Sequence, residues 1–131
     1  MNFLVDTQVW LWSFLEKDRI KRKVAAVLED PLNSIWLSPI SIWEATLLFE
    51  KGRIKLQGEP IAWIRAALAK GFVKEAGISH EIALHSRWID LPHQDPADRF
   101  IVATALVNGF TLVTSDAHLL ACKAIKTLAN R

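Results

Sequence analysis

Residues 95–116 read DPADRFIVATALVNGFTLVTSD, and this stretch decides the fold because it encodes a helix followed directly by a strand. Asp95 supplies an N-cap acceptor and Pro96 suits the first helical turn, so together they predict a helix start. The pair Asn108-Gly109 predicts where that helix ends. The β-like run at 110–114 follows without a linker. A long helix that leads into a strand in this way is the repeating unit of an α/β sheet.

The remainder of the chain alternates in the same way. Further short β-like runs are expected at residues 2–5, 34–37, 72–76 and 124–127. Helices are expected at residues 7–15, 20–29, 38–51, 59–70, 80–86 and 116–121. We therefore expect residues 1–131 to form a single α/β domain of three layers, with a central, mostly parallel sheet of four to five strands flanked by helices.

The composition excludes several classes of protein. The chain is 51% hydrophobic, which is too apolar for an intrinsically disordered protein. It has no run that approaches the roughly 18 uncharged apolar residues of a membrane span, and its first residues lack the basic stretch and cleavage site of a signal peptide. Its single cysteine, Cys122, excludes an internal disulfide framework. These features predict a cytoplasmic protein with no membrane association.

The charge of the chain leaves its partners open. The formal net charge is only +2, but basic residues crowd the short segment 17–23. That segment is either an ordinary solvated helix face or part of a surface that holds a polyanion beside bound cations.

Four acidic residues lie beside apolar segments, where a lone carboxylate is costly: Asp6, Glu44, Asp98 and Asp116. Asp6 and Asp116 follow predicted strands, and the carboxyl ends of parallel strands form ligand sites where the strand order reverses. Glu44 and Asp98 have apolar residues at helical spacings of three and four, which turns both side chains toward the core. We therefore expect all four acids to meet in one pocket. A pocket of carboxylates without matching bases indicates a divalent metal ion.

Each acid taken alone also has an ordinary structural explanation. Asp6 and Asp116 could simply cap helices, and Asp98 could be the capping-box partner of Asp95. Glu44 is the hardest to explain in this way, because no Lys or Arg lies four residues before or after it on the helix.

The ordered set of these motifs resembles the PIN-domain ribonucleases, and more narrowly the VapC-type toxins of type II toxin–antitoxin systems. The resemblance covers the whole chain and rests on FLVDT at 3–7, SIWE at 41–44, HQDPADRFIVATA at 93–105 and LVTSD at 112–116. It implies a PIN-like parallel sheet between helices and a metal-dependent endoribonuclease that uses Mg²⁺, with Mn²⁺ as an alternative. It also implies an RNA substrate, a cognate antitoxin protein and a homodimer.

The resemblance assigns roles to individual residues. The family's four acidic positions fall on Asp6, Glu44, Asp98 and Asp116, and the neighbours expected to support them are Thr7, Thr114 and Ser115. Asp95 is interpreted as a helix cap.

The chemistry of the donors favours Mg²⁺ or Mn²⁺ over zinc, because all are hard oxygens. We expect Asp6 and Asp98 to ligate the ion directly and Asp116 to complete the site, while Glu44 acts through water or orients the nucleophile. The ion would lower the pKa of a water that attacks the phosphorus, so cleavage leaves a 5′-phosphate. His80 and His85 are five residues apart, so they do not share a helical face, and surface or capping roles are expected for His93 and His118.

The sequence alone leaves other functions open. A catalytically inactive PIN-fold binding module and a DNA nuclease with the same metal centre would share the fold. A phosphoacceptor receiver domain is disfavoured because Thr7, not a second acid, follows Asp6. A haloacid-dehalogenase-like phosphatase is disfavoured because Gln8 stands where that family has its second aspartate. The six tryptophans either pack in the core or anchor a partner interface.

Overall fold

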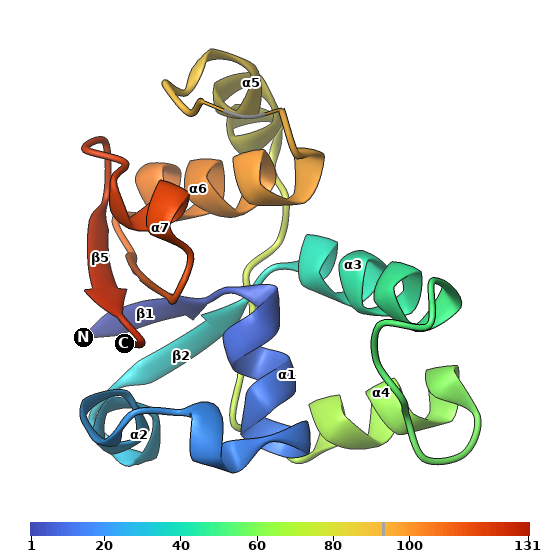
Figure 1. The fold of residues 1–131 in the computed structure, drawn as a ribbon. Coiled ribbons are helices and arrows are strands. Elements are labelled where there is room, and N and C mark those ends of the chain that lie inside the picture. Colours follow the sequence, from blue (N-terminus) through green and yellow to red (C-terminus); the bar gives the residue numbers. More distant parts are fainter. Residues whose placement is uncertain (93) are drawn as a thin grey trace.

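A five-stranded parallel sheet forms the centre of the computed structural model, which describes residues 1–92 and 94–131 (Figure 1). The strands are β1 (Asn2–Val5), β2 (Ser34–Leu37), β3 (Lys74–Glu75), β4 (Thr111–Thr114) and β5 (Lys126–Ala129). The helices of this described part are α1 (Thr7–Leu15), the 3₁₀ helix η1 (Lys17–Arg19), α2 (Arg22–Glu29), α3 (Pro39–Glu50), α4 (Pro60–Ala69), α5 (His80–Trp88), α6 (Pro96–Asn108) and α7 (Ala117–Leu120). The expected α/β class with a parallel sheet is confirmed.

The strand order is β3-β2-β1-β4-β5, so β1 lies at the centre and the chain extends the sheet first to one side and then to the other. β1 and β4 are parallel neighbours, with Val5 opposite Val113. The amide of Asp6 donates a hydrogen bond to the Val113 carbonyl over 3.1 Å, which extends this pairing past the end of β1. The carboxyl ends of β1 and β4 therefore meet where the strand order reverses, which is where open parallel sheets form their ligand sites.

Side-chain alternation along the strands produces the three layers. Phe3 and Val5 of β1 belong to one buried apolar cluster, together with side chains of α1, α2, α3 and α4. Leu4 points to the opposite cluster, which is built from α5, α6 and α7. In β4, Val113 belongs to the first cluster and Leu112 to the second. Because successive strand residues face opposite sides, two apolar helical layers enclose the sheet (Figure 1).

Three predicted boundaries were wrong in detail. The helix expected from residue 20 begins at Arg22, because Asn130 accepts a hydrogen bond from the Lys21 amide over 2.9 Å and holds that residue in an extended conformation. The strand expected at 124–127 lies at 126–129, where the four residues of β5 pair with those of β4. The strand expected at 72–76 is confined to two residues that pair with β2.

The helix predicted from Asp95 to Asn108 is confirmed at both ends. Asp95 accepts hydrogen bonds from the amides of Ala97 and Asp98 over 3.0 and 3.5 Å. Gly109 ends α6 in the left-handed region with φ of 68°, which side chains other than glycine rarely adopt.

A buried arginine fixes the start of α6 against the end of α5. Arg99 is 6% exposed, and its guanidinium donates hydrogen bonds to four carbonyls between residues 86 and 91, over 2.7 to 3.3 Å. Carbonyls in the last turn of a helix and just beyond it lack intrahelical partners, and this cation satisfies them. The position of the neighbouring Asp98 is thereby held by the packing of two helices.

Within the described residues, none of the helices has the length and apolar character needed to cross a lipid bilayer. The longest helix, α6, has 13 residues.

Candidate active site

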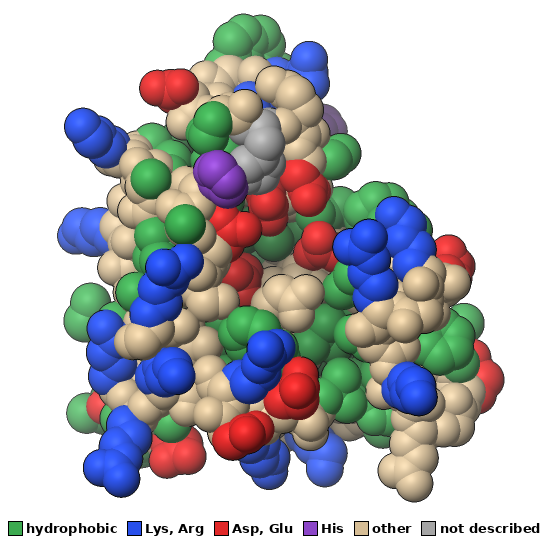
Figure 2. Space-filling view, in the orientation of Figure 1, with side chains coloured by type: hydrophobic (Ala, Val, Ile, Leu, Met, Phe, Trp, Pro, Cys, Tyr) green, Lys and Arg blue, Asp and Glu red, His purple; other side chains and the backbone are tan. Residues whose placement is uncertain are grey.

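A cavity of about 250 Å³ lies beyond the carboxyl ends of β1 and β4. Figure 2 shows the corresponding hollow, with acidic side chains gathered inside it. The structure therefore brings all four predicted acids together, although they come from four different segments of the chain. The residues that line the cavity are Asp6, Thr7, Gln8, Glu44, Asp95, Asp98, Ser115, Asp116 and Leu119.

Asp6 and Asp116 are positioned by the helices that they cap. One oxygen of Asp6 accepts from the Val9 amide over 2.8 Å. Asp116 accepts from the amides of His118 and Leu119 over 2.7 and 3.2 Å. The capping explanation and the shared-pocket explanation thus both hold, since an N-cap carboxylate at the end of a strand also points across the edge of the sheet.

Thr114 connects these two acids. Its hydroxyl donates a hydrogen bond to the second carboxylate oxygen of Asp6. The same hydroxyl oxygen accepts from the Asp116 amide over 3.0 Å. One fully buried side chain at the end of β4 therefore orients the Asp6 carboxylate and the Asp116 backbone together.

Glu44 and Asp98 approach the cavity from α3 and α6. Both side chains are half-buried. The hydroxyl groups of Thr7 and Ser41 lie 2.9 Å apart in a buried hydrogen bond that joins the first turn of α1 to α3, one turn before Glu44. Thr7, which was expected to support the acids, therefore links two of the four segments that carry them.

The environment of the cavity disfavours charged carboxylates. Burial raises the pKa of Asp6 to about 6, against the opposing hydrogen bonds from Thr114 and Val9. Burial, followed by the neighbouring charges of Asp95 and Glu44, raises the pKa of Asp98 to about 7. The pKa of Glu44 is raised by burial as well, and a hydrogen bond from Thr7 opposes part of that change. The site therefore favours the binding of a cation or of protons.

The donor set fits a hard divalent cation. All the carboxylates offer oxygen, and the described histidines do not line the cavity. Within the described residues, no three acidic, histidine or cysteine side chains already form a group that could hold a metal ion. Mg²⁺ commonly uses one or two carboxylates and completes its shell with water and phosphate oxygens, so a preformed cage is not required.

Sequence reasoning missed part of this site. Asp95 was interpreted only as a cap, but it also lines the cavity and raises the pKa values of Asp98 and Glu44. Its position three residues before Asp98, in the same helical turn, was the available signal. Gln8 lines the cavity as well, and its place in the first turn of α1, two residues after Asp6, could have indicated it. His93 lies outside the described residues.

Chemistry, not size, identifies this cavity as the site. A larger cavity, of about 530 Å³, lies beside α1 and α2 and is lined mostly by apolar residues, with Lys17, Glu29 and Lys70 among its charged ones. It contains no cluster of carboxylates that could act on a substrate together.

Replacing Thr114 by valine should weaken Mg²⁺ binding. The variant loses the hydroxyl that lowers the pKa of Asp6, so protons compete more strongly with the cation. We expect the Kd for Mg²⁺, measured by a thermal-shift titration, to rise about 10- to 100-fold. Thr114→Ser keeps the hydroxyl and is the matched control. Equal Mg²⁺ affinity of the valine and serine variants would contradict this role.

Comparisons with known proteins agree with the geometry. The chain matches the PIN domain over residues 3–124. It is 33% identical over 119 residues to ribonuclease VapC22 of Mycobacterium tuberculosis, and the alignment covers 88% of each chain.

Solved structures share the fold. The chain matches VapBC2 of Rickettsia felis, solved with a DNA fragment from its promoter, with a TM-score of 0.74 and 15% identity over 98% of each chain. It matches VapBC-1 of nontypeable Haemophilus influenzae with a TM-score of 0.71 and 18% identity over 99% of this chain and 98% of the other.

Proposed function

The chain belongs to the PIN-domain family, in its VapC-type branch, and on that premise we propose that it is a metal-dependent endoribonuclease, the toxin of a toxin–antitoxin pair. The observation that carries the proposal is the gathering of Asp6, Glu44, Asp98 and Asp116 in one cavity, in an environment that raises the pKa of the first three. Carboxylates placed in this way bind the divalent cations on which phosphodiester hydrolysis depends.

Each acid has a distinct part in this proposal. Asp6 and Asp98 would hold Mg²⁺ or Mn²⁺ directly, because burial makes their charged forms most in need of a cation. Asp116 would complete the site from the end of β4, and Glu44 would orient the attacking water from α3. The bound cation would supply a water of lowered pKa and neutralise charge on the phosphate.

The surface around the cavity suits a polyanionic substrate. Lys and Arg side chains lie around the lower and right-hand rim of the acidic hollow in Figure 2. Such a rim attracts RNA, while a cation in the hollow offsets the repulsion between carboxylates and phosphate. Hydrolysis by water at such a site does not involve the ribose 2′-hydroxyl and is expected to leave a 5′-phosphate.

We further propose a cognate antitoxin protein and a homodimer. The structural relatives are components of VapBC complexes, which supports the first partner. Two tryptophans on separate helices, Trp43 and Trp88, are 50% and 76% exposed, which supports a surface that a partner covers. Trp10, in contrast, is completely buried in the core.

Labelled RNA and DNA of the same sequence, incubated with the purified protein with and without Mg²⁺, test the proposed activity. Cleavage of RNA only when Mg²⁺ or Mn²⁺ is present is the expected result. Preferred cleavage of DNA would instead identify a DNA nuclease. The absence of cleavage with either metal, across varied RNA substrates, would favour an inactive binding module.

A further inference from the structure

A second cavity, of about 260 Å³, adjoins the acidic cavity along α1. The two cavities share one lining residue, Gln8. We call the second cavity the arginine pocket, and its lining residues are Gln8, Leu11, Trp12, Leu15, Glu16, Arg19, Leu48, Arg53 and Ile54. Its α1 residues, at positions 8, 11, 12 and 15, follow the spacing of a single helix face. The pocket therefore continues from the acids down the side of α1.

One wall of the arginine pocket is Arg19, whose guanidinium contacts two neighbouring side chains. Its guanidinium carbon lies 4.8 Å from the centre of the Trp12 ring. One guanidinium nitrogen lies 3.7 Å from a carboxylate oxygen of Glu16. The aromatic ring beneath the guanidinium accepts no conventional hydrogen bond, so N–H donors of Arg19 stay available to a phosphate, which arginine can bind through two of them.

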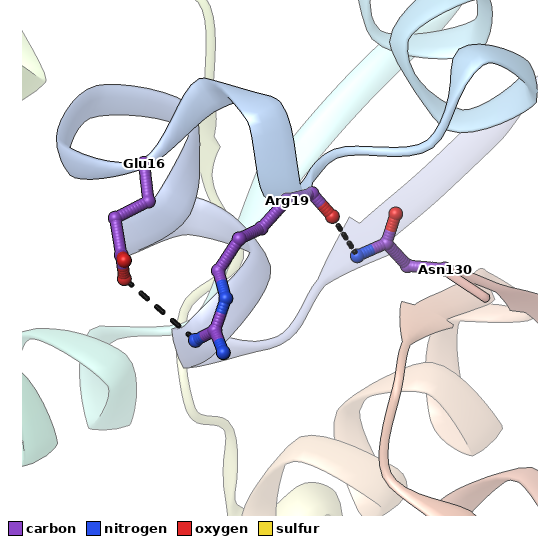
Figure 3. Close-up of polar contacts among 3 residues, drawn as sticks. All are labelled: Glu16, Arg19 and Asn130. Atoms are coloured by element: carbon purple, nitrogen blue, oxygen red, sulfur yellow. Dashed lines mark hydrogen bonds and ion pairs between the residues drawn. The ribbon is translucent and has the colours of Figure 1, made fainter.

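The backbone at Arg19 is held as well. Asn130, which is 3% exposed, donates a hydrogen bond to the Arg19 carbonyl over 3.1 Å (Figure 3). The same side chain accepts from the Lys21 amide over 2.9 Å. A residue close to the end of the sequence thus fixes the short segment that carries Arg19.

The opposite wall is formed where α3 ends. The Arg53 amide donates to the Leu48 carbonyl over 2.9 Å, which turns the chain back over the end of the helix. The pocket thereby receives two arginines from separate segments and one carboxylate, that of Glu16. Both members of the Glu16–Arg19 pair are more than half exposed, so little free energy opposes the replacement of Glu16 by a phosphate.

From these contacts we propose that the arginine pocket binds the phosphate of an RNA nucleotide that neighbours the cleaved bond. The proposal rests on the proposed function. A strand whose scissile phosphate lies at the carboxylates would pass Gln8 and reach Trp12 after about 6 Å along α1, at 1.5 Å per residue. Arg19 and Arg53 then bind the next backbone phosphate, which makes them substrate-positioning residues.

The test measures RNA binding in a protein that cannot cleave. In an Asp98→Asn background, Arg19→Gln, Arg53→Gln and the double variant are titrated with a fluorescent RNA oligonucleotide. Each single change is expected to raise Kd about tenfold, as for a charged hydrogen bond to phosphate. Each should also lower the slope of log K against log salt by about 0.7. The matched control, Arg65→Gln, removes an exposed arginine of α4 that does not line the pocket. If the Arg19 and Arg53 variants show the same Kd and the same salt slope as this control, the proposal is wrong.

Substrate length supplies a second readout. Removing one nucleotide from the end of the oligonucleotide that reaches the pocket should weaken binding to the Asp98→Asn protein that keeps both arginines. It should not weaken binding to the variant that also lacks both arginines. Equal losses in both proteins would refute a contact at this site. In the cleavage-competent protein, the arginine variants should raise KM and leave kcat within about twofold.

The outcomes separate the two proposals. If the unmodified protein cleaves no RNA but the arginine variants still lose RNA affinity, the pocket proposal stands and the proposed activity is wrong. Cleavage of RNA with unchanged KM in the arginine variants would do the reverse.

Discussion

Asp98→Asn is expected to abolish RNA cleavage while the protein stays folded. Asparagine keeps the shape of the side chain but removes the charge that would hold the cation. A loss of about 4 kcal/mol of transition-state stabilisation, a reasonable share of what a metal ion contributes, lowers kcat about 1,000-fold. The measurement is the initial rate of cleavage of a labelled RNA at saturating Mg²⁺.

The fold should tolerate this change. Asp95, not Asp98, caps α6, and Arg99 holds the helix start in place through its bonds to carbonyls at the end of α5. The substitution also removes one of several neighbouring carboxylates, whose mutual repulsion contributes to the raised pKa of Asp98. Metal-free Asp98→Asn should therefore melt no lower than the parent protein at pH values above about 7.

A matched control distinguishes the site from a general effect of charge. Asp90→Asn removes an exposed aspartate just after α5 that does not line the cavity. It should cleave RNA at the parent rate. If Asp98→Asn retains more than about a tenth of the parent rate, Asp98 does not hold the cation as proposed.

The predictable part of the molecule is the part that depends on local sequence. The start of α6 followed from Asp95 and Pro96, and its end from Gly109, because caps act within one helical turn. The placement of Asp6 and Asp116 at adjacent strand ends followed from a general property of parallel sheets. Glu44 could be assigned inward because apolar neighbours repeat at helical spacing around it.

The parts that escaped prediction depend on contacts between distant residues. Nothing near Asn130 in the sequence shows that its side chain bonds to the backbone at Arg19 and Lys21, 111 and 109 residues away. Arg99 was read only as part of a motif, because its carbonyl partners belong to a different helix and loop. The second role of Asp95 likewise became visible only when the cavity brought it beside Glu44.

These distant contacts surround the site. Thr114 joins the ends of β1 and α7, Thr7 joins α1 to α3, and Arg99 joins α5 to α6. One of these contacts reaches the Asp6 carboxylate itself, and the others connect the segments that carry or adjoin the remaining acids. The apolar layers of the sheet are already specified by side-chain alternation. Periodicity indicates which elements form, while these few polar contacts determine how closely the carboxylates approach.

Mg²⁺ is expected to raise the melting temperature of the protein, and to do so more strongly at high pH. Asp6 and Asp98 have folded-state pKa values of about 6 and about 7, whereas the ordinary value of an aspartate is 3.8. Between these limits the folded protein holds more protons than the unfolded chain, so metal-free stability from these groups falls as pH rises. The proposed cation would bind the deprotonated carboxylates and so reverse this loss.

The size of the effect follows from mass action. At a Mg²⁺ concentration about 100 times its Kd, binding stabilises the folded state by about 2.7 kcal/mol. For a domain of this length, that corresponds to a rise in melting temperature of about 10 °C. At about pH 5 the same concentration should have a much smaller effect, because protons occupy Asp6 and Asp98. The measurement is a set of thermal melts across pH, with and without Mg²⁺.

A variant isolates the groups responsible. In the double variant Asp6→Asn, Asp98→Asn, the metal-free decline of stability with pH should be shallower, and the response to Mg²⁺ should disappear at every pH. Asparagine at position 6 retains an oxygen that can accept from the Val9 amide, so the cap on α1 is preserved. A melting temperature that rises equally with Mg²⁺ in the parent protein and in this variant would show that the cation binds elsewhere. The cavity would then be a cluster of helix caps, held partly protonated near neutral pH, and not the centre of a metal-dependent nuclease.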